Sequence, residues 1–149
     1  MIYIAHRGNI YEKKPDQENT PEYISIALKS EINVEIDVWF MHGTFFLGHD
    51  NPQTPVNENF LYQDGLWIHA KNVEALNLLK NKCNCFFHDH DDYTLTSKNY
   101  IWVYPGKPLV SGCVAVLPET VNYSDEDLKK CYAICSDNVL GLYDKINNI

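Results

Sequence analysis

The sequence has no run of about 18 uninterrupted apolar residues, the length that a membrane-spanning helix requires. It is also poor in basic residues, because 12 Lys and Arg stand against 20 Asp and Glu, which gives a formal net charge of −8. No stripe of basic side chains, the usual footprint of a nucleic-acid-binding protein, is visible. We therefore expect neither a membrane span nor a nucleic-acid partner.

A disulfide framework is also missing. The chain has five cysteines, an odd number, and neither Cys83-x-Cys85 nor Cys131-x3-Cys135 has the paired spacing of a zinc site. We interpret them as reduced and mostly buried thiols. The first residues, Met1 to Arg7, lack the basic region and the long apolar segment of a secretory signal. Both features favour a cytoplasmic protein.

The length of 149 residues predicts a single domain over 1–149, and 45% hydrophobic residues are sufficient for a core. Strands and helices alternate early in the chain, which is typical of parallel βαβ units in an α/β fold. The clearest helix start is Thr20-Pro21-Glu22, with an N-cap followed by proline. We expect strands at 2–5, 33–40, 45–48, 66–71, 85–88, 100–104, 113–117 and 131–135, helices at 20–30, 73–80 and 124–130, and a loop at 51–64.

Polar side chains interrupt two of the predicted strands at a spacing of two. Glu35 and Asp37 share one face of their strand, since alternate side chains in a strand point the same way. This pattern favours a divalent cation site, and the alternative is an exposed polar edge strand. His69 and Lys71 repeat the spacing on the next strand, so His69 is a candidate metal ligand and Lys71 a candidate phosphate contact. The alternatives are a hydrogen-bonded core histidine and a solvated strand end.

Two further histidines lie near glycines at predicted strand ends. In His6-Arg7-Gly8, histidine titrates near neutral pH and arginine grips phosphate with a planar fork. Gly8 permits a ligand to approach the backbone closely. His49 follows Gly48 after the short strand at 45–48. Each motif is weak evidence when it is taken alone.

Four motifs in order carry more weight: Ala5-His6-Arg7-Gly8, Glu18 to Glu22, Glu35-Ile36-Asp37-Val38 and Gly48-His49-Asp50. Together they resemble the N-terminal half of the glycerophosphodiester phosphodiesterase family, which is similar to the phosphatidylinositol-specific phospholipases C. Residues 2–50 carry the strong match. Tyr132 to Asp137 resembles the last barrel strand of the family with its terminal aspartate.

The resemblance implies a compact TIM-type (β/α) barrel, with several outer helices shortened or missing because of the length. It also implies an enzyme of lipid metabolism, a metal-dependent phosphodiesterase that hydrolyses a small glycerophosphodiester-like substrate. His6 and His49 would be the general base and general acid, and Arg7 would hold the phosphoryl group. Glu35 and Asp37 would bind the metal.

This chain has His69-Ala70-Lys71 where the family usually has Glu-x-Lys. The expected cofactor is Mg²⁺ or Ca²⁺, and the imidazole of His69 extends the choice to Mn²⁺, Fe²⁺ or Zn²⁺. Trp102 is predicted to wall the substrate pocket, with core packing as the alternative. The cluster His88 to Asp92 is either a solvated acidic loop or a source of groups at the mouth of the site.

Two other functions stay open at this point. One is a catalytically degenerate barrel that binds a phosphorylated ligand or a protein partner. The other is a different metal enzyme, with a separate transition-metal site formed by His69 and residues 88–92. Because few helices are predicted, we also expect a homo-oligomer that covers apolar strand surface near residues 85–117.

Overall fold

The computed structural model describes residues 1–148, which form a ten-stranded sheet and four short helices. The strands are β1 (Ile2–His6), β2 (Asn33–Met41), β3 (Thr44–Leu47), β4 (Thr54–Val56), β5 (Leu66–Ala70), β6 (Cys85–Phe86), β7 (Tyr93–Leu95), β8 (Ile101–Val103), β9 (Val114–Val116) and β10 (Ala133–Ser136). The helices are α1 (Pro21–Lys29), α2 (Val73–Leu79), α3 (Asp125–Lys129) and α4 (Val139–Asn147), and 3-10 turns lie at Glu58–Tyr62 and Pro118–Thr120.

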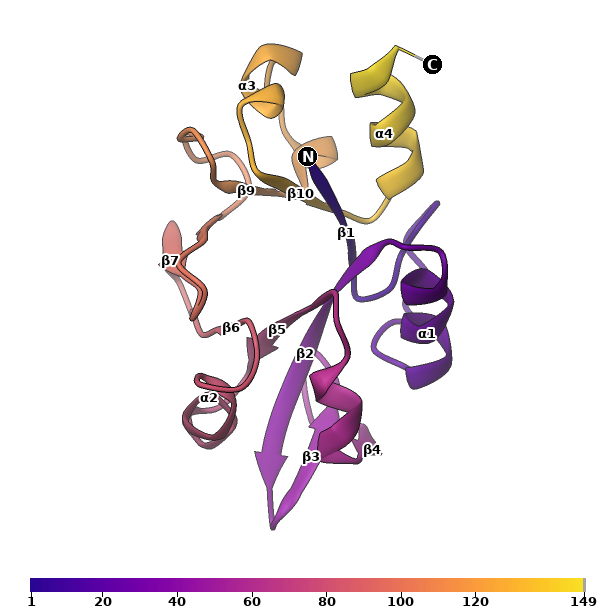
Figure 1. The fold of residues 1–149 in the computed structure, drawn as a ribbon, viewed down its shortest axis with the longest axis vertical. Helices are drawn as coiled ribbons and strands as arrows, with labels where there is room; N and C mark the ends of the chain where they lie inside the picture. Colours follow the sequence, from indigo (N-terminus) through magenta and orange to yellow (C-terminus); the bar gives the residue numbers. More distant parts are fainter. Residues whose placement is uncertain (149) are drawn as a thin grey trace.

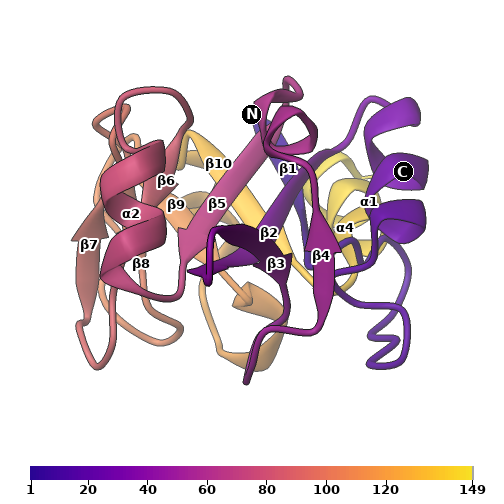
Figure 2. The same ribbon diagram turned by 90° about the horizontal axis from the view of Figure 1, so that it is seen from below.

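The main part of the sheet is parallel. Its strands follow the order β6-β5-β2-β1-β10-β9-β8, and this series curves around a centre that β1, β2, β5 and β10 border (Figures 1 and 2). β2 is long enough to pair with β1 at its start and with antiparallel β3 at its end, and β4 extends that arm. β7 is antiparallel to β8. The carboxyl ends of the parallel strands therefore meet along one edge of the curve.

The expected TIM-type barrel is wrong. Such a barrel closes eight strands into a ring and covers them with helices, whereas this sheet is mixed and its strand pairing ends at β6 and at β7 within the described residues. The reason lies in the second half of the chain, where the strands from β6 to β9 are two or three residues long. The four helices, of five to nine residues, lie outside the curve (Figure 1) and are too few and too short for the barrel's outer layer.

Apolar side chains fill both sides of the sheet. On the outer side, Val34, Ile36 and Val38 of β2 are fully buried with Ile24 of α1 and Leu79 of α2. This confirms the predicted alternation along β2. On the inner side, a second cluster combines Ile4, Trp67, Phe86, Trp102, Val114, Val116, Ala133 and Cys135. Two of these residues, Trp102 and Val116, also line the cavity described below.

The strongest local signals are confirmed. Helix α1 begins at Pro21, and the Thr20 hydroxyl accepts a hydrogen bond from the Tyr23 amide at 3.4 Å.

The predicted loop at 51–64 is wrong, because it contains β4 and a 3-10 turn. Strand β4 was not predicted because it contains Pro55, although proline is tolerated in an edge strand. Helix α4 was missed because Gly141 weakens its pattern.

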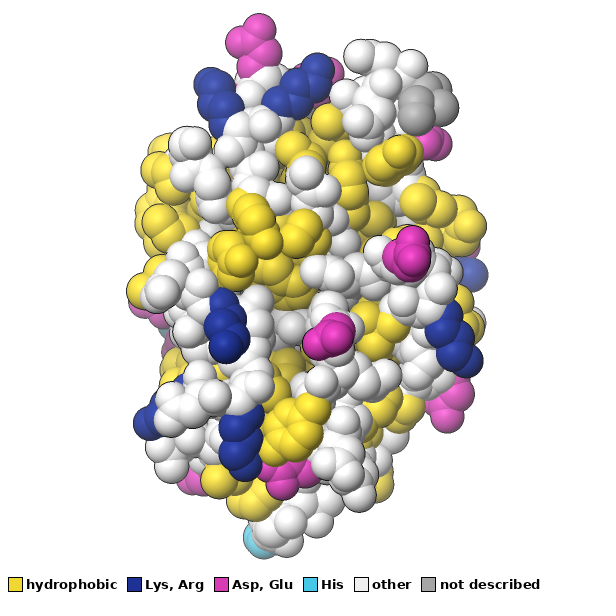
Figure 3. Space-filling model, viewed as in Figure 1, with side chains coloured by type: hydrophobic (Ala, Val, Ile, Leu, Met, Phe, Trp, Pro, Cys, Tyr) yellow, Lys and Arg dark blue, Asp and Glu magenta, His cyan; other side chains and the backbone are white. Residues whose placement is uncertain are grey.

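The face of the molecule drawn in Figure 3 shows no stripe of basic side chains, as expected from the sequence. On the face drawn in Figure 3, Lys and Arg are interspersed with Asp and Glu, and histidine appears only at the lower edge. The histidine-lined cavity described below therefore does not open onto this face. Within residues 1–148, no helix is long and apolar enough to cross a membrane. Tyr93 and Leu95 of β7 are exposed, and the expected self-association through this region stays a prediction.

Candidate metal and phosphate site

The strand register assembles a polar site at the carboxyl ends of the parallel strands. His6 of β1 lies beside Glu35 of β2, and Asp37 lies beside His69 of β5. Glu35 and Asp37 share one side of β2 because only Ile36 separates them, and His6 and His69 lie on the same side of the sheet. They line a cavity of about 260 Å³. Its lining residues are His6, Arg7, Glu35, Asp37, His49, His69, His88, Asp91, Thr94, Trp102, Tyr104, Pro105, Val116 and Leu117.

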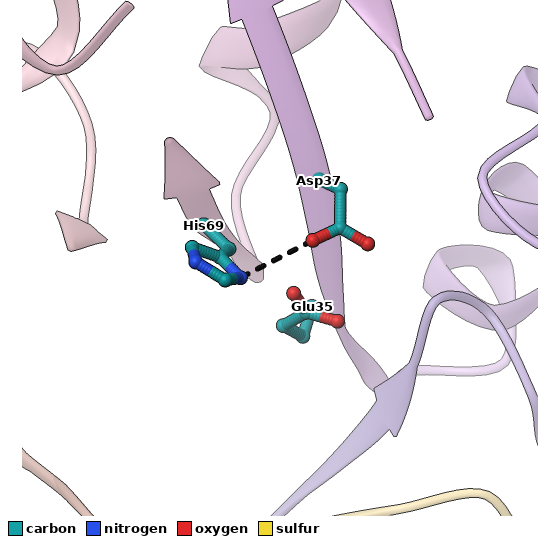
Figure 4. Close-up of side chains that lie close together, drawn as sticks. All are labelled: Glu35, Asp37 and His69. Carbon is teal, nitrogen blue, oxygen red and sulfur yellow. Dashed lines mark ion pairs between the residues drawn. The ribbon is translucent and has the colours of Figure 1, made fainter. Parts of the chain in front are cut away.

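Glu35, Asp37 and His69 form a buried group within this site. Each offers one ligand atom, and these atoms lie within 4.8 Å of one another. The side chains converge in Figure 4, where His69 Nδ1 lies 3.2 Å from Asp37 Oδ1. Glu35 is 2% exposed and Asp37 is 1% exposed, yet Glu35 Oε2 and Asp37 Oδ1 have no hydrogen-bond partner. Two buried carboxylates this close to each other are costly unless positive charge compensates them, so this arrangement fits a divalent cation.

The other oxygen of Asp37 is held by protein groups. Asn19 Nδ2 donates to Asp37 Oδ2 at 2.9 Å, and Arg7 Nε lies 3.2 Å from the same oxygen. The Asp37 amide also donates to Asn19 Oδ1 at 3.0 Å. Burial by itself would raise the pKa of Asp37, but His69, Arg7 and Asn19 hold it below its usual range. Asp37 is therefore ionised, and its other oxygen, Oδ1, faces His69 Nδ1 at 3.2 Å and Lys71 Nζ at 3.9 Å.

Glu35 has the opposite electrostatic environment. Burial and the neighbouring charge of Asp37 raise the pKa of Glu35 above its ordinary value, although His6, His69 and Arg7 oppose the shift. Two adjacent buried carboxylates repel each other, and a cation between them would relieve this repulsion. A cation bound at this place would lower the pKa of Glu35.

His6 is held by a carboxylate from the other end of the chain. His6 Nδ1 lies 2.8 Å from Asp137 Oδ1, and Asn9 Nδ2 donates to the same oxygen at 2.8 Å. Burial lowers the pKa of His6, but Asp137 and the charge of Glu35 outweigh burial and raise it. Because an ionised carboxylate only accepts, His6 donates through Nδ1. Its Nε2 lies on the cavity side, 3.8 Å from Glu35 Oε2.

Arg7 occupies a strained position between carboxylates. Its backbone is left-handed, with φ 54°, a conformation that costs a non-glycine residue about 1 kcal/mol or more. Its Nη1 donates to Glu18 Oε2 at 3.2 Å, and Asn9 Nδ2 donates to the other oxygen of Glu18 at 2.9 Å. Gly8 follows with φ 95°, where a Cβ would meet the Tyr23 ring at 2.8 Å. This tight turn fixes the guanidinium at the cavity.

His49 borders the cavity from a compact turn after β3. The Gly48 amide donates to the Asp37 carbonyl at 3.2 Å, and Trp39 Nε1 donates to the Gly48 carbonyl at 2.6 Å. His49 Nδ1 lies 2.8 Å from Asp50 Oδ1. The side chain of His49 is 42% exposed. His49 and His6 thus each have Nδ1 next to an aspartate, although His49 is far more open to solvent.

The acidic cluster at 88–92 is divided between cavity and solvent. His88 and Asp91 line the cavity, whereas Asp89 and His90 are exposed and lie 3.6 Å apart. The His88 ring stacks on His69 with centroids 4.5 Å apart. Burial, together with His69 and Lys71, lowers the pKa of His88 to about 4, so it is a neutral imidazole near pH 7. His88 is not part of the group of converging ligand atoms.

The remaining predicted contacts differ in their placement. Trp102 is 5% exposed and lines the cavity while its ring stacks on Phe86, so it belongs to both the wall and the core. Lys71 does not line the cavity, and its Nζ lies 3.9 Å from Asp37 Oδ1. Its position favours neutralising the carboxylates over contacting a phosphate.

Four polar residues that organise the site had no role predicted from the sequence: Asn9, Glu18, Asn19 and Asp137. Asn9 and Asn19 are 0% and 3% exposed. Asn9 bridges the carboxylates of Glu18 and Asp137, whereas Asn19 contacts the side chain and the main-chain amide of Asp37. Glu18 and Asn19 belong to a quoted motif, and Asp137 follows the last predicted strand. The sequence thus drew attention to Glu18, Asn19 and Asp137 without indicating their roles, whereas no sequence pattern pointed to Asn9.

Comparison with known protein families, characterised proteins and solved structures gives no match for this chain.

Proposed function

We propose that this protein is a metal-dependent phosphodiesterase that hydrolyses a small glycerophosphodiester-like substrate. The observation that carries the proposal is the buried Glu35–Asp37–His69 group, which lines the same cavity as Arg7, His6 and His49. A cation and an arginine are the two devices by which an acidic protein concentrates positive charge on a phosphate. A cation held by this group would lie in the same cavity as the guanidinium of Arg7.

The donor set suits a divalent metal. Glu35 Oε2, Asp37 Oδ1 and His69 Nδ1 would hold the ion, because the first two atoms have no hydrogen-bond partner and the third faces them. When bound, the ion would neutralise charge on the phosphoryl oxygens and lower the pKa of an attacking hydroxyl. A set of two oxygens and one nitrogen favours Mn²⁺, Fe²⁺ or Zn²⁺ over Ca²⁺, which prefers six to eight oxygens.

The two histidines would move the protons. His6 would accept a proton through Nε2, since Asp137 holds its Nδ1 and orients the ring. His49 would donate a proton to the departing alcohol. Arg7 would hold the phosphoryl group between them. A hydroxyl neighbouring the phosphate attacks phosphorus, the second alcohol leaves with the proton from His49, and water then opens the cyclic phosphate.

The size of the cavity limits the substrate. About 260 Å³ accommodates a small polar molecule and excludes most of a lipid with acyl chains. The five cysteines are free and buried, which favours a reducing compartment such as the cytoplasm. We therefore propose a small water-soluble phosphodiester as the substrate.

Phosphorus-31 NMR tests this proposal directly. The full chain is incubated with a glycerol phosphodiester of a small alcohol, with Mn²⁺, Mg²⁺ or a chelator. We expect the diester signal to be replaced by a monoester signal only when metal is present. Phosphate-ligand binding without turnover under every metal would instead support the alternative of a non-catalytic binding protein.

A further inference from the structure

A second hollow adjoins the site on the outer side of His49. It has a volume of about 250 Å³, and Arg7 and His49 line both this hollow and the inner cavity. Its other walls include Lys13, Asp50 and Gln53, from the loops after β1 and β3. A phosphoryl group held by Arg7 would therefore have one space on each side, which is the arrangement that the two alcohols of a diester require.

The two spaces differ in chemistry. The inner cavity has a partly apolar wall, formed by Trp102, Val116 and Leu117. The outer hollow is lined by charged and amide side chains, and Pro15 is its single apolar residue within the described part of the chain. Polar groups that are aimed at a ligand select hydroxyl-bearing molecules and reject those that lack hydroxyls.

Two polar side chains in the outer hollow, those of Lys13 and Gln53, are available to contact a ligand. Glu18 is engaged by Arg7 and Asn9, and Asn19 is engaged by Asp37. Lys13, in contrast, makes no ion pair with any residue in 1–148, although its neighbour Lys14 lies 3.7 Å from Glu12. Gln53 is held by its backbone, because its amide donates to the Leu47 carbonyl at 2.9 Å. The ammonium and the side-chain amide are thus available to a ligand.

The turn that carries this hollow is closely packed. Gly48 has φ 149°, and a Cβ there would lie 2.1 Å from the Asn51 carbonyl oxygen. His49 and Gln53 flank this contact, and the Gln53 side chain lies 3.1 Å from the same Cβ position. A ligand in the outer hollow would therefore lie in a defined position relative to the His49 ring.

We infer that the outer hollow is a subsite for the leaving alcohol of the phosphodiester, and that Lys13 and Gln53 make it selective for a neutral alcohol with several hydroxyls. This inference rests on the proposed function. Attack and departure occur on opposite sides of phosphorus, so the nucleophile lies on the inner side with His6. The P–O bond to the outer alcohol breaks, its electrons pass to that oxygen, and the proton comes from His49.

Calorimetric binding of two uncleavable phosphonate analogues tests the subsite apart from catalysis. Both analogues carry glycerol on one side, and the other side is either a second glycerol or a benzyl group. We expect the wild type to bind the glycerol analogue more tightly. Lys13→Ala should reduce that preference about tenfold, the effect of losing one hydrogen bond from a charged donor. Gln53→Ala should reduce it as well.

Lys14→Ala and Gln17→Ala are the matched controls, since both residues are near in sequence and neither lines the hollow. Unchanged preference in both controls, with loss in Lys13→Ala, supports the subsite. Equal weakening of both analogues by Lys13→Ala, or no weakening, overturns it. If the wild type shows this selectivity but cleaves no diester, the proposed function and the leaving-group role both fail, and the hollow is a binding site for a polyol only.

Discussion

Nδ1 of His6 lies 2.8 Å from Oδ1 of Asp137, which joins the end of the first strand to the residue that follows the last one. This contact fixes the imidazole so that Nε2 lies on the cavity side. Asn9 donates to the same oxygen at 2.8 Å, so the carboxylate is held from two directions. The contact between the first and last strands of the sheet thus orients His6, the proposed general base.

Replacing Asp137 should alter both the rate and its pH dependence. His6 must be neutral to accept a proton, and Asp137 helps to raise the pKa of His6, so activity in the wild type should rise as the pH passes that raised value. Asp137→Asn removes this contribution. The acidic limb of the pH–rate profile should therefore move to lower pH, while the maximal rate falls about 10²-fold or more because ring orientation is lost. An unchanged limb would show that Asp137 does not control His6.

The two proposed proton-transfer groups should each be needed for turnover. We expect His6→Ala and His49→Ala to lower kcat about 10²-fold or more. His42→Ala is the control, because His42 lies in the exposed turn between β2 and β3 and does not line the cavity. Steady-state kinetics of the three variants checks this. Equal losses in all three would indicate damage to the fold in place of lost catalysis.

The third ligand should determine the choice of metal. His69→Glu would replace the imidazole by a carboxylate, so the preference for Mn²⁺ or Zn²⁺ over Mg²⁺ or Ca²⁺ should fall at least about tenfold. Calorimetric titration with each ion measures this ratio, and circular dichroism checks that the variant is folded. If the ratio stays constant, His69 does not contribute a ligand.

How far the sequence predicts this site depends on how local each signal is. The alternation of Glu35 and Asp37 with apolar neighbours correctly places both on the inner face, because the period of a strand fixes it. The pairing of Asp37 with His69 follows from parallel strands in order. Asn9 and Asp137 are brought together over 128 residues by the sheet, which no local pattern encodes.

The incorrect prediction of a TIM-type barrel also arose because local motifs do not report on distant strand pairing. The four N-terminal motifs lie within residues 5–50, and they say nothing of the second half of the chain. There the strands β6 to β9 are short and β7 turns back on β8, so the sheet stays open. Strand number and closure depend on non-local pairing, which residue spacing does not determine.

The turn at Gly8 should be sensitive to a single methyl group. Gly8→Ala would combine a left-handed backbone, with φ 95°, and a Cβ at 2.8 Å from the Tyr23 ring. We expect a loss of about 2 to 4 kcal/mol in the free energy of unfolding. Gly43→Ala is the control, since its φ is 75° but nothing lies within 4 Å of its Cβ, and it should cost only about 1 kcal/mol. Urea denaturation compares them, and equal costs would exclude crowding at Tyr23.

The central claim is that Glu35, Asp37 and His69 hold one divalent ion, and calorimetric titration of Mn²⁺ into the metal-free chain tests it most directly. Glu35→Gln keeps the shape of the side chain but removes its charge. The account predicts one ion per chain in the wild type and an affinity at least about 10²-fold weaker in Glu35→Gln, since a buried charged ligand is lost. Equal Mn²⁺ affinity in the wild type and Glu35→Gln, or no binding to either, would contradict it.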